Sequence, residues 1–344
     1  MWSILFMRGL ENHQESLMKI ETTASGKVFF SGEYMALEGG RAIILSTTQS
    51  VKVSISENNE TNNILFSSMS DRSYPFLIDE EMKIVWLEED PMRLGSILNE
   101  AVNQFNRNFS GKSISIDTSD FFYEERKIGI GSSAAVSVAL TKALNKLLGL
   151  KLGTKAMIDH SKQIHNRSQD STGSGFDIIA SFVKERALSC QLLDHERYEY
   201  QKIKFPEAIK VFAVVNNACS QTSEMINRYK AAKNKFGDYF SNHAPKMKSE
   251  LDRLHDAILK KDPILIMDYL IRYNESLVEM DNKFSLGVFD HHHDFISLAK
   301  DKGIFYKPSG SGGGDLGLLI SDDKIRLDKI CKELTSKGLY LFEI

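Results

Sequence analysis

A loop rich in glycine and serine runs directly into an apolar helix, and this junction constrains the chain more than any other feature. The loop spans 127–135 and contains Gly129, Gly131, Ser132 and Ser133. Apolar residues recur on most faces of the helix expected at 132–148, which predicts a buried helix. Glycines allow close backbone approach to a ligand, and a helix N-terminus offers unpaired N–H groups. The junction predicts a phosphate-binding turn or, more plainly, a glycine turn with a serine cap.

Two common nucleotide-binding loops are excluded at this junction. No Gly-Lys-Ser/Thr sequence follows the glycines, so the segment is not a Walker loop. The third glycine of a dinucleotide fingerprint is also missing.

Two further glycine clusters lie downstream. The first spans 171–177 and ends at Asp177, which serves either as a functional carboxylate or only as a helix cap. The other spans 307–315, with four glycines and two serines at 309–314, between strands predicted at 303–306 and 316–320. Such a loop predicts an anion-binding nest of backbone N–H groups, or a flexible hairpin.

Strands and helices are interleaved without the strict strand–helix rhythm of a parallel sheet, which predicts the α+β class. Period-two alternation predicts strands at 51–55 and 113–117, and helical spacing predicts helices at 92–109, 156–169 and 325–337. A helix-rich stretch is expected at 223–302, interrupted near Pro263 and Gly287.

We expect two domains, 19–200 and 201–344, in a chain of 344 residues. Residues 1–18 lack the order of a signal peptide. The stretch 11–18 is polar and featureless, and 1–18 is interpreted as a disordered or mis-assigned start.

Composition narrows the class of protein. Asp and Glu number 46 against 43 Lys and Arg, a net charge of −3, so no nucleic-acid or membrane partner is expected. Three widely spaced cysteines fit a reducing cytoplasm. The consecutive histidines at 291–293 do not share a helix face and are not expected to form a metal site. The aromatic residues at 121–123 are interpreted as core, with an adenine pocket as the alternative.

The order of three segments along the chain is more informative than any one glycine cluster alone. Residues 26–39, the loop 127–135 and the loop 307–315 resemble, in family order, the N-terminal, ATP-binding and C-terminal glycine motifs of the GHMP kinases. The resemblance implies a two-domain fold with the active site in the cleft between the domains. It also implies ATP and Mg²⁺ as cofactors, a small anionic metabolite as substrate, and a monomer or homodimer.

The resemblance assigns roles residue by residue. It implies that Lys27 and Asp177 are catalytic and that Ser133 ligates magnesium. The residues implied to bind ATP are Lys127, Gly129, Gly131, Ser132, Ser133 and Ala134.

Within the superfamily, Gly32-Glu33-Tyr34 resembles the phosphomevalonate kinases, whereas mevalonate kinases and galactokinases usually carry Gly-Glu-His. The residues implied to bind substrate are Glu33, Tyr34, Ser174, Ser220, Thr222, Lys307, Ser309, Gly310, Gly312 and Gly313. The implied reaction is ATP-dependent phosphorylation of phosphomevalonate to diphosphomevalonate. Mevalonate kinase, another GHMP small-molecule kinase, or a catalytically silent nucleotide or metabolite binder are the alternatives.

One departure from the family pattern bears on the metal. Mevalonate kinases place a metal-binding glutamate eleven residues before the aspartate, and Asn166 stands there in this chain. The resemblance therefore leaves a second protein ligand for magnesium unassigned. It also disfavours mevalonate kinase.

Overall fold

The computed structural model describes residues 19–344 except 170–172, 195–196, 217, 219–221 and 315. The interpretations of residues 1–18, Ser171, Thr172 and Ser220 lie outside the described residues.

The first half of the chain builds a mixed sheet, with eight strands among the described residues. Its strand order is β10-β9-β2-β6-β3-β4-β5, and β1 pairs with β2 off this path. All pairs are antiparallel except β3 with β6. The strands are β1 (Ile20–Ser31), β2 (Ala42–Glu57), β3 (Asn63–Ser67), β4 (Ser70–Ile78), β5 (Ile84–Trp86), β6 (Lys112–Asp117), β9 (Ala187–Leu192) and β10 (Tyr198–Lys202).

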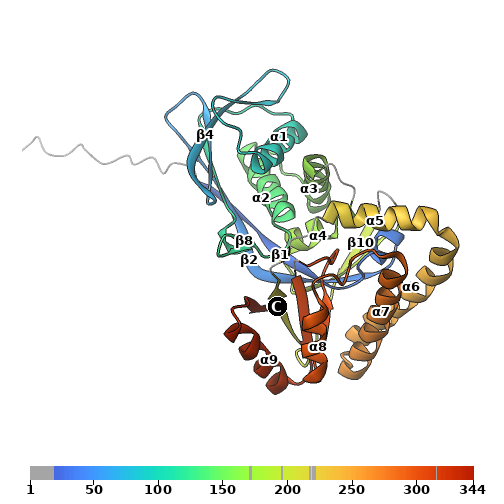
Figure 1. Cartoon of the computed structure of the whole chain (residues 1–344). Helices are drawn as coiled ribbons and strands as arrows, with labels where there is room; N and C mark the ends of the chain where they lie inside the picture. The colour runs from blue at the N-terminus through green and yellow to red at the C-terminus, as the bar shows by residue number, and fades with distance from the viewer. Residues whose placement is uncertain (1–18, 170–172, 195–196, 217, 219–221, 315) are drawn as a thin grey trace, which may run out of the picture.

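Four helices cover one face of this sheet (Figure 1). They are α1 (Arg93–Phe105), α2 (Ser132–Leu147), α3 (Thr154–Gln169) and α4 (Phe176–Val183). Both α2 and α4 pack directly on β1 and β2, and α3 packs on α2. Ten residues of α2 are buried, from Ala134 to Leu144, so the apolar composition of this helix reflects its position between the sheet and its neighbours.

The second half forms an antiparallel sheet in the order β12-β13-β11-β14. Its strands are β11 (Lys210–Val215), β12 (Phe305–Pro308), β13 (Leu316–Ser321) and β14 (Leu341–Glu343). Its helices are α5 (Thr222–Lys235), α6 (Gly237–Lys260), α7 (Pro263–Phe284), α8 (His293–Asp301) and α9 (Lys324–Ser336). Figure 1 shows this sheet, with α8 and α9, on the opposite side of the large sheet from α1–α3. Short elements complete the fold: η1 (Met35–Glu38), η2 (Ser119–Phe121), β7 (Phe122–Tyr123) and β8 (Arg126–Lys127).

One apolar core joins the two sheets. It includes Val28 and Phe30 of β1 as well as Val211 of β11 and Ile320 of β13. The ring of Phe30 meets Phe205, in the connection between the sheets, edge-on at 5.0 Å between ring centroids. The chain passes from one sheet to the other between 202 and 210, while the domain limits 19–200 and 201–344 stay a prediction.

The predicted α+β class is confirmed. The predicted strand at 51–55 is part of the longer strand β2, which begins at Ala42. Strands β3, β4 and β5 were not predicted.

Candidate active site

Strand β1 connects the first glycine loop to the third. The backbone N–H of Lys27 donates to the carbonyl of Ile130 at 3.0 Å. Two residues further, the N–H of Phe29 donates to Ser309 Oγ at 2.9 Å, and the Ser309 hydroxyl donates to the Phe29 carbonyl at 3.1 Å. Loops about 180 residues apart in sequence therefore bond to neighbouring positions of one strand.

The first loop opens the N-terminus of α2. Gly131 is the N-cap residue, with a φ of 84°, a left-handed conformation that favours glycine. A Cβ at this position would lie 3.0 Å from Lys27 Cε, so the lysine side chain passes directly over the glycine. Because Gly131 has no side chain, no N-cap group bonds to the first N–H groups of α2. This arrangement suits an anion beside Lys27.

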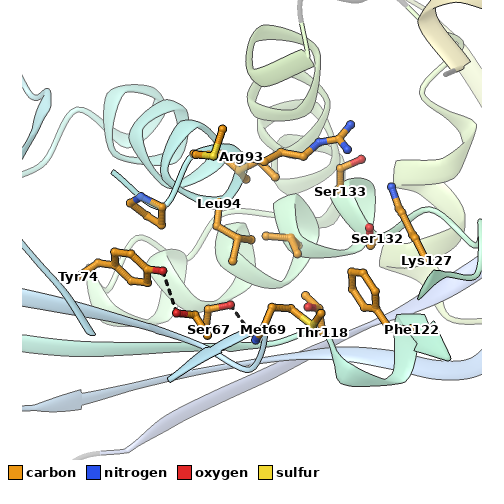
Figure 2. Close-up of a pocket in the computed structure, with 15 residues that line it drawn as sticks. Ser67, Met69, Tyr74, Arg93, Leu94, Thr118, Phe122, Lys127, Ser132 and Ser133 are labelled. Carbon is orange, nitrogen blue, oxygen red and sulfur yellow. Dashed lines mark hydrogen bonds between the residues drawn. The ribbon is translucent and has the colours of Figure 1, made fainter. Parts of the chain in front are cut away.

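A pocket of about 310 Å³ opens beside this helix N-terminus. Figure 2 shows Lys127, Ser132 and Ser133 at one end of the pocket and Tyr74 at the other. Its polar end thus coincides with the start of α2. Its further apolar lining residues are Met69, Pro91, Met92, Leu94, Ile97, Phe122 and Val136, and its further polar ones are Ser67, Ser70, Arg93 and Thr118. The volume lies in the range of small-molecule sites, and the lining fits a ligand with a flat apolar part and an anionic part.

Sequence reasoning missed most of this lining. Ser67, Met69 and Tyr74 come from the hairpin β3–β4, and Arg93 and Leu94 from α1. Phe122 is half-buried in the pocket wall, consistent with the adenine-pocket alternative for 121–123.

Asp177 lies at the N-terminus of α4, which packs on β1 and α2. Its carboxylate accepts the N–H of Ile178 at 2.9 Å, a local bond that fits a helix-end role as well as a functional one. Burial lowers the pKa of the neighbouring Lys162, while the carboxylates of Asp159 and Asp177 oppose that shift. The Lys162 chain lies against Gly175, where a Cβ would be 2.5 Å from Cε. Lys162 is therefore a cation beside Asp177 that the sequence analysis did not identify.

A buried ion pair joins the N-terminal motif to the third loop. Lys307 is 0% exposed and Glu33 is 3% exposed. The Lys307 ammonium pairs with the Glu33 carboxylate and also donates to the Pro308 carbonyl at 2.6 Å. The Tyr273 hydroxyl donates to the backbone carbonyl of Glu33. Both predicted substrate ligands are thus engaged with each other inside the protein, an arrangement that favours a positioning role.

The third loop is fixed from two sides. The Tyr34 hydroxyl donates to the Ser311 carbonyl at 2.7 Å, and the N–H of Gly313 donates to the Val288 carbonyl at 3.0 Å. A Cβ on Gly312 would lie 2.3 Å from that same Val288 oxygen, so only glycine fits there. Burial raises the pKa of Tyr34 well above its usual range, and nearby Asp281 adds to this effect.

The support for Val288 also escaped the sequence analysis. The buried Asp281 carboxylate accepts the N–H groups of Gly287, Val288 and Phe289 at 2.7–3.0 Å. His292 is 0% exposed, and its Nδ1 lies 2.9 Å from the Tyr306 hydroxyl. Burial lowers the pKa of His292 to about 4. Asp281 thus holds the turn at 287–289, whose Val288 carbonyl accepts the N–H of Gly313 in the third loop.

Other predicted ligands have only local contacts. Ser174 Oγ lies 3.4 Å from the N–H of Phe176, and Thr222 is the exposed first residue of α5. Among the described residues no group of three or more His, Cys, Asp or Glu side chains is placed to hold a metal ion. Ser133 at the pocket fits a Mg²⁺ ion that is held largely by phosphate oxygens. No helix within the described part of the chain is long and apolar enough to span a membrane.

Comparisons with known proteins bear on the family and the fold of this chain. Residues 96–185 match the GHMP kinases N terminal domain. Over 339 residues the chain is 21% identical to a phosphomevalonate kinase of Saccharolobus solfataricus, covering 94% of this chain and 96% of that protein. A phosphomevalonate kinase of a Streptomyces species is 21% identical over 345 residues, with 89% and 90% covered.

Solved structures share the fold over nearly the whole chain. The Lin0012 protein from Listeria innocua has a TM-score of 0.81 at 19% identity, covering 94% of this chain and 97% of that one. Streptococcus pneumoniae phosphomevalonate kinase in complex with phosphomevalonate and AMPPNP has a TM-score of 0.73 at 19% identity, with 94% and 100% covered. The L. major mevalonate kinase in complex with R-mevalonate has a TM-score of 0.73 at 16% identity, with 96% of this chain and 97% of that one covered.

Fold and site together define the two-domain GHMP kinase fold, as the sequence predicted. Residues 96–185 match the N-terminal domain of the GHMP kinases, and the chain resembles the phosphomevalonate kinases over most of its length.

Proposed function

We propose that this chain uses Mg-ATP to phosphorylate a small isoprenoid-pathway metabolite, with phosphomevalonate as the acceptor and diphosphomevalonate as the product. One observation supports this proposal above the others. Strand β1 places the Lys27 side chain over Gly131, and two residues further its Phe29 backbone is hydrogen-bonded to the Ser309 hydroxyl. A donor phosphate at the start of α2 and an acceptor at the third loop would then lie on either side of one lysine.

In this proposal the ATP phosphates bind at the start of α2 and the base occupies the pocket. Backbone N–H groups of the first loop and the Lys27 ammonium neutralise the charge of the transferring phosphoryl group, because phosphoryl transfer depends mainly on positioning and charge stabilisation. Ser133 contributes to holding Mg²⁺, which supplies further charge neutralisation when bound. The third loop receives the acceptor.

The role proposed for Asp177 depends on the acceptor. An alcohol needs a base to take its proton, whereas a phosphate monoester has a second pKa of about 6 and is mostly dianionic at neutral pH. With phosphomevalonate, Asp177 therefore orients Lys27 or the metal and takes no proton. We expect Asp177→Asn to lower kcat only moderately with phosphomevalonate, because no general base is then removed. A loss of kcat as severe as that expected for removal of a general base, with a pH–rate profile that follows a carboxyl group, would contradict this assignment.

The experiment is ADP release with Mg-ATP against mevalonate, phosphomevalonate, diphosphomevalonate, homoserine and galactose. We expect turnover with phosphomevalonate alone. The Lys27→Met variant is the control, since it should lose turnover and still bind nucleotide. Turnover with another acceptor would support a GHMP kinase activity and refute phosphomevalonate as the acceptor. Nucleotide binding without turnover on any acceptor would indicate a catalytically silent binder.

A further inference from the structure

Helix α3 places the side chain of His165 next to Ser133, which lines the pocket at the start of α2. His165 Nε2 lies 3.1 Å from Ser133 Oγ, and both residues are half-buried. Their backbone carbonyls accept other hydrogen bonds. The Ser137 hydroxyl donates to the Ser133 carbonyl at 2.9 Å, and the Ser168 hydroxyl donates to the His165 carbonyl at 3.0 Å. The contact between α3 and the start of α2 is therefore a contact of side chains at the edge of the pocket.

A serine hydroxyl has one proton to donate and two lone pairs to offer. A hydroxyl that gives lone pairs to a cation must direct its proton to another acceptor. The Nε2 atom of a neutral imidazole is such an acceptor when the ring proton sits on Nδ1. In that tautomer the lone pairs of Ser133 remain available to a ligand in the pocket that Ser133 lines.

We propose that His165 is a positioning residue that holds the Ser133 hydroxyl as a ligand for the divalent cation of a bound metal–nucleotide complex. The inference rests on the proposed function. Among the described residues no group of three or more metal-ligating side chains occurs, and Asn166 follows His165 directly. A neutral serine ligand leaves the full charge of the cation to the phosphates, so the cation should bind together with the nucleotide and weakly without it.

The opposite tautomer makes a different prediction. If Nε2–H donates to Ser133 Oγ, the serine proton is directed to a phosphate oxygen, and the pair acts on the nucleotide whether or not a metal is present. Measurements with and without metal therefore distinguish the two arrangements.

The test uses Mn²⁺ as a paramagnetic probe and the full chain. Free Mn²⁺ is measured by electron paramagnetic resonance in the presence of ADP, and ADP affinity is measured separately in excess chelator. We expect His165→Leu to weaken Mn²⁺ binding to the ADP complex by about tenfold, the lower end of what loss of a ligand-orienting group costs. ADP affinity in chelator should stay within about twofold. His165→Gln should recover part of the loss, because its amide oxygen accepts the same proton.

A double-mutant cycle supplies the sharper criterion. In a Ser133→Ala background, His165→Leu should cause no further loss of Mn²⁺ binding. His160→Leu is the matched control on the same helix, since His160 packs against Phe105 away from Ser133 and should leave Mn²⁺ binding unchanged.

Three outcomes would overturn the inference. Unchanged Mn²⁺ binding in His165→Leu would remove the role of His165. An equal loss of ADP binding in chelator would assign the pair to the phosphates. Additive losses in the cycle would show that His165 acts independently of Ser133. Absence of ADP binding by the unmodified chain would instead refute the proposed function and this inference with it.

Discussion

At the scale of single residues, Lys307 is expected to have a large effect on stability, because its ammonium is completely buried. Its partners are the Glu33 carboxylate and the Pro308 carbonyl. Removing one member of a buried ion pair leaves the other charge without compensation, at a cost of about 3–5 kcal/mol. We expect Lys307→Met to lower the free energy of unfolding by that amount, measured by urea denaturation.

The matched variant combines Lys307→Met with Glu33→Gln, which removes both charges. It should recover most of the lost stability, because no buried charge is then left unpaired. If Lys307→Met instead keeps the free energy of unfolding of the unmodified chain and loses only affinity for the acceptor, Lys307 contacts the substrate directly, as the family resemblance implied.

His292 makes the stability of the fold dependent on pH. Burial lowers its pKa from 6.5 to about 4, and His291, Lys307 and His293 add to this shift. Between these two values the unfolded chain binds a proton that the folded protein does not, so stability falls as pH decreases from 6.5 towards 4. We expect this residue to account for about 2–3 kcal/mol of that loss.

The measurement is urea denaturation at pH 7.5 and pH 5 for the unmodified chain and for His292→Leu. The variant should be less stable at pH 7.5, because Tyr306 loses its partner, yet lose less on acidification. His293→Gln, at an exposed neighbouring position, should keep most of the pH dependence, because burial is the main cause of the shift in the pKa of His292. Identical pH dependence in His292→Leu would assign the acid sensitivity to other groups.

These residues show how far sequence reasoning reaches at this scale. The turn at Gly131 could be predicted, since glycine conformation and helix-end chemistry are local properties. The pairing of Glu33 with Lys307 could not, because 274 positions separate the two residues and only the fold brings them together. His165 and Lys162 escaped for the same reason, although both lie within a helix that was predicted.

At the scale of elements, the third glycine loop depends on one close backbone approach. Gly312 has a φ of 73° and would place a Cβ 2.3 Å from the Val288 carbonyl. We expect Gly312→Ala to move the loop away from Val288 and to lower kcat by at least about tenfold, since displacement of about 1 Å has large effects on catalysis. Steady-state kinetics and circular dichroism would separate lost activity from lost fold.

Gly338→Ala is the control for backbone strain. Its φ of 82° is equally left-handed, but no atom lies within 4 Å of the position of a Cβ. It should cost about 1–2 kcal/mol of stability and leave kcat unchanged. A Gly312→Ala enzyme with normal kcat would mean that the contact with Val288 does not fix the loop in its active position.

Elements with strong periodicity were predicted well, and short ones were not. Helices α2, α3 and α9 end within two residues of their predicted ends, since apolar spacing and helix stops are local signals. Strands β3 to β5 carry exposed apolar residues such as Phe66, Leu77 and Val85, which disguise the alternation of buried and exposed positions. The hairpin that supplies one wall of the pocket was missed for this reason.

At the scale of the whole molecule, the two sheets share one core. Apolar residues of β1, β2, α6, α7 and β13 belong to the same buried cluster. Catalysis as proposed requires the first loop and the third loop to keep their spacing along β1. A common core provides that rigidity, because a packed interior deforms little. The folding of the two halves should therefore be coupled.

Phe205 tests this coupling, because it lies between the sheets and packs edge-on against Phe30. Phe205→Ala should lower the free energy of unfolding by about 3–5 kcal/mol, the usual cost of deleting a buried aromatic ring. In native-state hydrogen exchange, amides of α2 in the first half and of β13 in the second should lose protection together and by the same free energy. Phe240→Ala, in the separate cluster around Tyr229, is the matched control and should affect α5 and α6 more than α2. If Phe205→Ala loosens β13 and leaves α2 protected, the halves fold independently, and the bonds from β1 to Ser309 alone must hold the two loops in register.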